Sequence, residues 1–210
     1  MIKIENVDVW GFEHAIRGMR NPMNSWDKSD SNFDLNGVHF SIGENDLDLM
    51  RRLYKAGSEH RKYLRQIFVS MDITAPLYWW KEFDTYKVGT VANSCSTMHK
   101  IHTKEFNVDD FSHDHIEDTH NYQLLLDIID SLNEHRKAFN TENDPIIKKR
   151  HWYEMIQMLP SSYNQKRTIT MNYENVISMI NQRETHKLNE WRNFVGCLRQ
   201  LPYVDEIIGR

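Results

Sequence analysis

Small polar side chains between Thr85 and His99 form the part of the chain whose residue types best suit ligand binding. They follow an apolar, aromatic run that begins at Ala75. Their hydroxyl, amide, amine and imidazole groups can hold an anion or a polar ligand through many hydrogen bonds. The same residue types favour turns, so a Ser/Thr-rich connection is the alternative interpretation. The side chains in question are Thr85, Tyr86, Lys87, Thr90, Asn93, Ser94, Cys95, Ser96, Thr97 and His99.

Arg183 and His186 are a second candidate, because they fall in a segment that reads as a helix with a buried face. Arg183 follows Met179 by four residues and Ile180 by three, so it points to the same side as these apolar residues. A cation on an apolar stripe needs an anionic partner. That partner is either a carboxylate in a structural salt bridge or a phosphate of a ligand, and the sequence leaves both open.

Three histidines, His113, His115 and His120, lie among acidic residues and are of metal-ligand type. Their spacing matches neither a helical HExxH motif nor a familiar zinc arrangement. A solvated acidic loop is therefore favoured, and a metal-dependent hydrolase is the weakest of the hypotheses. The sequence has no GxGxxG, no GxxxxGK[ST] and no nucleophile elbow, and Cys95 has no evident catalytic partner. We predict no catalytic nucleophile and no resident metal.

The composition is that of an ordinary globular chain. With 210 residues, 40% hydrophobic and 27% charged, it predicts a single domain over residues 1–210. The net charge of -4 argues against non-specific binding to nucleic acid, which needs a basic face. No window approaches the roughly 18 uninterrupted apolar residues of a membrane helix. Two cysteines and a start without an apolar leader favour the cytoplasm.

Hydrophobic periodicity and turn residues predict the elements that position these candidates. In the first half, Tyr78 and Glu82 share one face of a predicted helix that has Pro76 in its first turn. The elements expected there are a strand at 2–9, a helix at 12–20, an irregular segment at 21–43, a helix capped by Asn45 and ended by Gly57, a strand at 66–73 and a helix at 77–86.

In the second half, Ser112 is expected to cap a helix that runs to about Phe139. Asp144 and Pro145 open a helix over 145–159, and the alternation at 166–171 predicts a strand. Asn172 is the expected N-cap of one long helix toward Leu198. Helices and a few strands mix without βαβ alternation, so the predicted fold class is α+β.

The order of these features resembles the flavin-dependent thymidylate synthases, the ThyX family. That family has a strand ending in Ala-Pro, an aromatic helix and the signature RHRxxSxNxxSxRY. Here Ala75-Pro76 leads to TYKVGTVANSCSTMH at the signature position. The family's later Leu-Pro, Thr-rich strand, Asn and helix Arg are matched by Leu159-Pro160, Thr168, Thr170, Asn172 and Arg183. The resemblance covers residues 45–100 and 155–195, about half of the chain.

The chain departs from the family's pattern mainly in its cations. The RHR triplet is Thr85-Tyr86-Lys87, the closing Arg-Tyr is Met98-His99, and a further family Arg falls at Ile156. The signature Ser matches Thr90, and Asn93 and Ser96 match if one residue is inserted after Thr90. Each missing cation removes a charge-assisted contact worth about 1.5–3 kcal/mol. The candidates to replace them are Arg17, Arg20, Lys100 and Lys166.

The resemblance implies a ThyX-like fold, with a small antiparallel sheet packed with several helices. It implies a homotetrameric flavoprotein of nucleotide biosynthesis, a methyltransferase that converts dUMP to dTMP with FAD, NADPH and methylenetetrahydrofolate. A regulatory or nucleotide-binding module without turnover is the alternative that the lost cations suggest. The implied cofactor-binding residues are Lys87, Asn93, Ser96, His99 and His186, and the implied nucleotide-binding residues are Arg183, Tyr86, Thr90 and Glu82.

Overall fold

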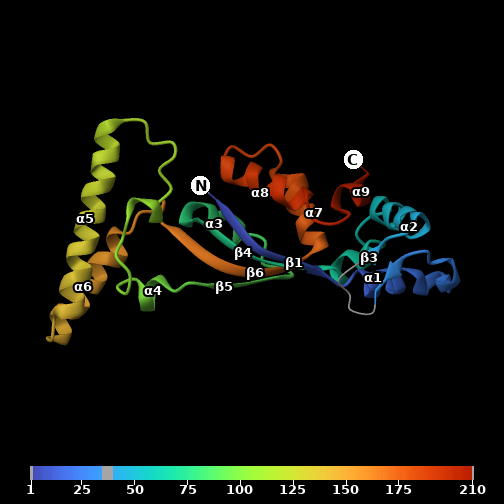
Figure 1. Ribbon diagram of the computed structural model, residues 1–210, viewed down its shortest axis with the longest axis horizontal. Helices are drawn as coiled ribbons and strands as arrows, with labels where there is room; N and C mark the ends of the chain where they lie inside the picture. Colours follow the sequence, from blue (N-terminus) through green and yellow to red (C-terminus); the bar gives the residue numbers. More distant parts are fainter. Residues whose placement is uncertain (1, 35–39, 210) are drawn as a thin grey trace. The chain divides into compact units, whose positions relative to one another are not determined.

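The computed structural model describes residues 2–34 and 40–209 and contains a four-stranded antiparallel sheet (Figure 1). The strand order is β1-β4-β6-β5, with β1 at Lys3–Trp10, β4 at Phe68–Pro76, β6 at Asn164–Asn172 and β5 at Thr90–Ser94. A short ribbon pairs β2 (Asn32–Phe33) with β3 (Phe40–Ser41), Asn32 facing Ser41. The predicted α+β class is confirmed.

The burial pattern of strand β4 explains why its sequence predicted a strand. Its residues alternate between half-buried and fully buried, with Val69, Met71, Ile73 and Ala75 inside. This period of two is what a strand with one face on a core requires. The strand runs three residues beyond the predicted end, to Pro76, which is the N-cap of the next helix and not part of its first turn.

The chain divides into two compact units, and the division falls within all four strands of the main sheet. The first unit comprises the described residues up to Ile4, Asp72–Thr85 and Ala92–Thr168, and the second comprises Glu5–Met71, Tyr86–Val91 and the described residues from Ile169. The expected single domain over residues 1–210 stays a prediction.

The first unit is built on two helices that run side by side, α5 (Thr119–Thr141) and α6 (Pro145–Met158) (Figure 1). Leu125, Ile129 and Leu132 of α5 pack with Met155 of α6 in one core cluster. Asp144 caps α6, accepting hydrogen bonds from the backbone N–H groups of Ile146 and Ile147, as Asp-Pro predicted. The unit also contains the shorter α3 (Leu77–Phe83), α4 (Thr97–Lys100) and η4 (Val108–Asp110).

Two predicted helix boundaries in this unit are wrong. The helix at 77–86 ends at Phe83, because the Thr85 hydroxyl donates to the carbonyl of Glu82 and competes with a further turn. Ser112 is not the N-cap of α5. Its hydroxyl donates to the side chain of Asn164, and Asp118 caps α5 instead.

The second unit holds α1 (Phe12–Arg20), α2 (Glu44–Lys55) and, near the end of the chain, α7 (Tyr173–Arg183), α8 (Asn189–Arg199) and α9 (Val204–Ile208). The strand prediction at 66–73 missed η3 (Lys62–Gln66), which packs against α1 and α7. Asn172 caps α7, as predicted, by accepting from the backbone of Asn175.

The predicted single helix from Asn172 to Leu198 is wrong, because it breaks into α7 and α8 between Glu184 and Leu188. The two helices pack on each other, so the apolar stripe of each faces the same interior. Val176 and Met179 on α7 and Trp191 and Val195 on α8 are all buried. Two stripes that meet in one core have the same sequence pattern as one continuous stripe.

The irregular segment at 21–43 is organised by one buried carboxylate, that of Asp46, as far as its described residues show. Two short 3₁₀ turns (Asn21–Met23 and Trp26–Lys28) and β2 lie in it, and residues 35–39 are outside the described part. Arg20 Nε lies 2.6 Å from Asp46 Oδ1, and both side chains are almost fully buried. The other carboxylate oxygen accepts from the hydroxyls of Ser29 and Ser31, at 2.8 and 2.6 Å, and from two backbone N–H groups.

Asp30 explains why Asn45 is not the N-cap of α2. Its carboxylate accepts from the backbone N–H groups of Asn45 and Asp46, at 2.9 and 3.1 Å, and so caps the helix from another part of the chain. Gly43 occupies the N-cap position without a side chain, and a Cβ there would overlap Asp30. The predicted end of α2 is confirmed, because Gly57 follows it with a φ of 107°.

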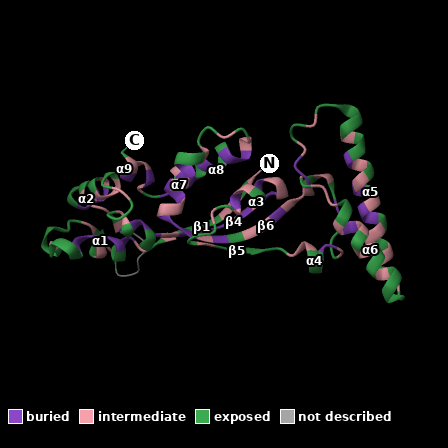
Figure 2. Ribbon diagram, turned by 180° about the vertical axis from the view of Figure 1, so that it is seen from behind, coloured by how far each residue is buried: buried purple, intermediate pink, exposed green. Residues whose placement is uncertain are grey.

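Burial differs sharply among the strands of the sheet (Figure 2). In β5 only Thr90 is half-buried and the other four residues are exposed.

No helix of the described residues is long and apolar enough to cross a membrane.

Replacing Asp46 with Asn is expected to lower the free energy of unfolding by about 3 kcal/mol or more, because it leaves the buried Arg20 guanidinium without its counter-charge. Urea denaturation measures this loss. The control is Asp48→Asn, whose ion pair with Arg52 is exposed and should contribute under about 1 kcal/mol. Equal losses in the two variants would contradict the role given to Asp46.

Stability is also expected to fall in acid through Asp46. Burial raises the pKa of this carboxyl, but the hydrogen bonds from Ser31, Ser29 and Arg20 and the charge of Arg20 outweigh burial and hold the pKa below its ordinary value of 3.8. The stabilisation is therefore complete above that value and is lost as the pH falls through the lower pKa of the folded state. Denaturation curves below about pH 4 should show a weaker pH dependence in Asp46→Asn than in the wild type.

Candidate functional site

A polar groove between η3 and α7 lies in the second unit. It has a volume of about 220 Å³ and is lined by Arg61 and Leu64 on one side. On the other side, α7 presents successive turns of one face, with Glu174, Ile177, Ser178, Asn181 and Gln182. Hydroxyl, amide and guanidinium groups along an apolar floor are typical of sites for polar ligands.

Two arginines share the single carboxylate of Glu174 beside this groove. Arg61 Nε lies 3.2 Å from Glu174 Oε1, and Arg65 Nε donates to Oε2. Burial raises the pKa of Glu174, but hydrogen bonds from Arg65 and Arg61 and their charges outweigh it and hold the pKa below its usual range. With Glu174 ionised, the three groups carry a net charge of about +1, which suits an anion.

Tyr86, Arg183 and Trp191 form a cluster next to the groove. Arg183 Nε donates to the Tyr86 hydroxyl at 2.9 Å, and the Arg183 guanidinium lies 4.8 Å from the centre of the Trp191 ring. The Tyr86 hydroxyl donates in turn to Gln182, at 3.0 Å. Gln182 therefore belongs both to the groove and to the cluster. The prediction that Arg183 lies on the buried face of its helix agrees with its place against Trp191.

His186 lies in the turn that follows α7. Its Nδ1 accepts from the backbone of Leu188 at 3.2 Å, and its ring lies 6.1 Å from that of Trp191. Lys87 is exposed in the turn that follows Tyr86, and Thr90 is half-buried at the start of β5. The second unit thus brings Tyr86, Thr90, Arg183 and His186 to α7 and its ends.

The first unit contains a different pocket, of about 390 Å³, which includes Ser96 and three lysines. Lys104 pairs with Asp110 at 2.8 Å, and Lys166 pairs with Asp72 at 3.0 Å. Lys100 makes no ion pair with any described residue. The Ser96 hydroxyl caps α4 by accepting from the backbone of His99. This pocket combines hydroxyl and ammonium groups, as an anion site requires.

The other predicted residues of the first unit are spread over three elements. Glu82 is half-buried on α3, Asn93 is exposed on β5, and His99 is exposed on α4. The binding roles given to these residues and to those of the second unit stay predictions. The expectation that all of them form one binding site stays a prediction as well.

The prediction that Arg20 could replace one of the missing cations is wrong, because its side chain is buried and paired with Asp46. Arg17 is near His14 on α1, at 3.1 Å. Lys100 and Lys166 do line a pocket together with Ser96. The sequence reasoning missed Arg61, Arg65 and Glu174. Their pairing spans more than 100 residues and no local pattern reveals it.

The histidines considered as metal ligands do not form a site. His113 Nδ1 lies 2.9 Å from the carbonyl of Phe111, and His115 is exposed beside Asp114. Within residues 2–34 and 40–209, no three His, Cys, Asp or Glu side chains are grouped as a metal site would need.

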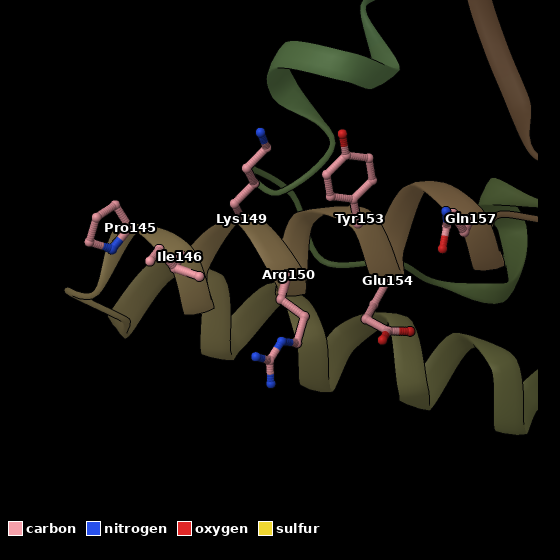
Figure 3. A pocket seen from close by; sticks show the side chains of 7 residues that line it. All are labelled: Pro145, Ile146, Lys149, Arg150, Tyr153, Glu154 and Gln157. Atoms are coloured by element: carbon pink, nitrogen blue, oxygen red, sulfur yellow. The ribbon is translucent and has the colours of Figure 1, made fainter.

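A hollow of about 760 Å³ on α6 is less suited to a ligand (Figure 3). All seven residues that line it belong to this one helix. Figure 3 shows Lys149 and Tyr153 on one side of the helix and Arg150 and Glu154 on the other. Side chains that diverge in this way cannot converge on a small molecule.

Comparison with solved structures assigns the fold. Thymidylate synthase X (ThyX) from Helicobacter pylori, in a structure with FAD and dUMP, matches with a TM-score of 0.67 over 99% of this chain and 97% of that one, at 14% identity. A second structure of ThyX from this organism, complexed with FAD and dUMP, matches with a TM-score of 0.67 and 15% identity over 98% and 97% of the two chains. The sequence matches no protein-family model and no curated protein.

The protein therefore has the fold of the flavin-dependent thymidylate synthases. The resemblance inferred from about half of the sequence extends, at the level of the fold, to nearly the whole chain.

Replacing Tyr86 with Phe removes the hydroxyl that joins Arg183 to Gln182, and we expect it to lower the free energy of unfolding by about 1–2 kcal/mol. Urea denaturation is again the measurement. Tyr153→Phe, on the exposed face of α6, is the matched control and should have little effect. A Tyr86 variant as stable as the control would show that this hydroxyl adds nothing to the cluster.

Proposed function

We propose that this protein is a flavin-dependent thymidylate synthase-like enzyme that binds FAD and a pyrimidine deoxynucleotide such as dUMP. The observation that carries the proposal is the match to ThyX structures with FAD and dUMP over nearly the full length of the chain. Its reaction would be the methylation of dUMP to dTMP, or a variant of it, with NADPH and methylenetetrahydrofolate as co-substrates.

The groove between η3 and α7 fits the diphosphate of a flavin dinucleotide. Arg61 lines the groove and Arg65 lies beside it, so that two guanidinium groups share the one carboxylate of Glu174. A guanidinium group can donate two parallel hydrogen bonds to phosphate oxygens. Gln182 connects this groove to the half-buried ring of Tyr86, which offers a flat surface to a ligand ring. Trp191 is fully buried and supports the cluster from inside. When bound, the flavin would supply the redox chemistry.

The chain's own residues would bind and orient the ligands. In this proposal Lys87, Asn93, Ser96, His99 and His186 contact the cofactor, and Arg183, Tyr86, Thr90 and Glu82 contact the nucleotide. Lys100 and Lys166 would supplement the cations that the signature segment lacks, since both line the pocket with Ser96. No covalent nucleophile is required, because the protein positions and polarises the nucleotide against the flavin.

A homotetramer is part of this proposal. The segment from Val88 to Ser94 supports it, because Val88 is 91% exposed and Val91 is 65% exposed. Val91 is on the edge strand β5 and Val88 is in the turn just before it, and apolar side chains this exposed suit contact with another chain.

The second candidate function is binding without turnover. It is favoured by Tyr86, which stands where the family's triplet has His and whose hydroxyl is already engaged by Arg183 and Gln182. Such a protein would hold the flavin or the nucleotide as a regulatory module.

Flavin binding tests the proposal most directly. Titration with FAD should give bound-flavin absorbance and raise the melting temperature, because a ligand of the folded state stabilises it. Arg61→Gln should weaken FAD binding by roughly tenfold, since a charge-assisted hydrogen bond contributes about 1.5 kcal/mol or more. Arg52→Gln, which breaks only an exposed ion pair, is the control. A protein that binds no FAD would refute the proposal.

An activity assay separates the two candidates. Formation of dTMP from dUMP that depends on both NADPH and methylenetetrahydrofolate supports the enzyme. Binding of FAD and dUMP without this product supports the regulatory module.

A further inference from the structure

The turn after Tyr86 is held against the first turn of α7 by one side chain, that of Asn175. Asn175 Nδ2 donates to the carbonyl of Val88 at 2.7 Å and to the Thr90 hydroxyl, also at 2.7 Å. Both hydrogens of the amide are therefore used on residues that lie 85 and 87 positions earlier in the chain. The turn between them contains Gly89.

Gly89 fits closely under the same helix end. Its φ of 76° is in the left-handed region that favours glycine. A Cβ at this position would lie 2.7 Å from the Asn172 side chain and 3.3 Å from that of Asn175. The turn therefore contacts α7 at the N-cap residue Asn172 as well as through Asn175.

The position of Asn175 in the helix indicates that its side chain serves the turn. Asn172 is the N-cap, so Asn175 is the third helical residue, and its backbone N–H already bonds to the Asn172 side chain. A Glu or Gln at this position usually returns a hydrogen bond to the N-cap backbone. The shorter Asn reaches across to Val88 and Thr90 instead.

The other end of the turn is fixed to the opposite end of α7. Tyr86 is bonded to Gln182 and Arg183, which lie seven and eight residues after Asn175 and so roughly 12 Å along the axis. One helix thus anchors both sides of Lys87 and Val88. Lys87 is exposed and makes no ion pair with any described residue.

We infer that Asn175 is a positioning residue that fixes the Lys87–Thr90 turn in the conformation that binds the ligand. This inference rests on the proposed function, in which Lys87 and Thr90 contact the flavin and the nucleotide. A turn that is already ordered loses less conformational entropy when a ligand binds, so the anchoring contributes to affinity without touching the ligand.

Two variants test the inference. Asn175→Ala removes the amide, and Asn175→Asp keeps the size and suits the first turn of a helix but cannot donate. The matched control is Asn121→Ala, because Asn121 is also the third residue of its helix, α5, and its backbone N–H also bonds to the N-cap side chain. Asn121 is exposed and lies in the first unit, remote in sequence from the turn.

The first measurement is hydrogen exchange of the amides at 87–91 in the ligand-free protein. Both Asn175 variants should exchange faster there, while Asn121→Ala matches the wild type. The second measurement is FAD affinity, which should fall by about tenfold in both Asn175 variants and stay unchanged in the control. In the double variant with Lys87→Ala, the loss should be close to that of Lys87→Ala alone, because Asn175 acts through Lys87.

A merely structural role would give a different result. Additive losses in the double variant, unchanged exchange at 87–91 or unchanged FAD affinity would each overturn the inference. If the wild type binds no FAD, the proposed function fails. The exchange data then still decide whether Asn175 orders the turn.

Discussion

The reversal of the chain between Glu184 and Leu188 is the constraint on which the second unit depends. If the helix continued, Trp191 would lie roughly 12 Å along the axis from Arg183. Because α8 folds back on α7, Trp191 lies under the Arg183 guanidinium instead, and His186 closes the turn by bonding to Leu188. The same packing buries the inner face of α7 and leaves its other face, with Glu174, Ser178 and Gln182, to line the groove.

Local signals in the sequence predicted the elements that are stabilised locally. The alternation in β4, the Asp144-Pro145 start of α6 and the Asn172 cap of α7 each depend on a few neighbouring residues. The missed features depend on partners far along the chain. Asp30 caps α2 although it lies fifteen residues before Asn45 in the sequence. The prediction that Asn45 is the N-cap of this helix was therefore wrong. The break after α7 was hidden because two packed helices share one apolar pattern.

The candidate site shows the same division. Sequence order placed Tyr86, Thr90 and Arg183, and the structure brings each of them to α7. Arg61 and Arg65 were missed, since their meaning depends on Glu174, more than 100 residues later. Two arginine–carboxylate systems also differ in a way that no sequence pattern reveals. The Arg20–Asp46 pair is buried and organises a loop, whereas Arg61, Arg65 and Glu174 are only partly buried and carry a surplus of positive charge at the groove.

Strand β5 lies at the edge of the sheet and is exposed along most of its length. Its sequence, TVANS, has neither the charged residues nor the proline with which proteins usually protect such an edge. An unprotected edge offers its free backbone groups to any other extended chain. The backbone of β5 is therefore a place where this sheet can be extended by a strand from another molecule, and its amino-acid sequence does nothing to prevent such pairing.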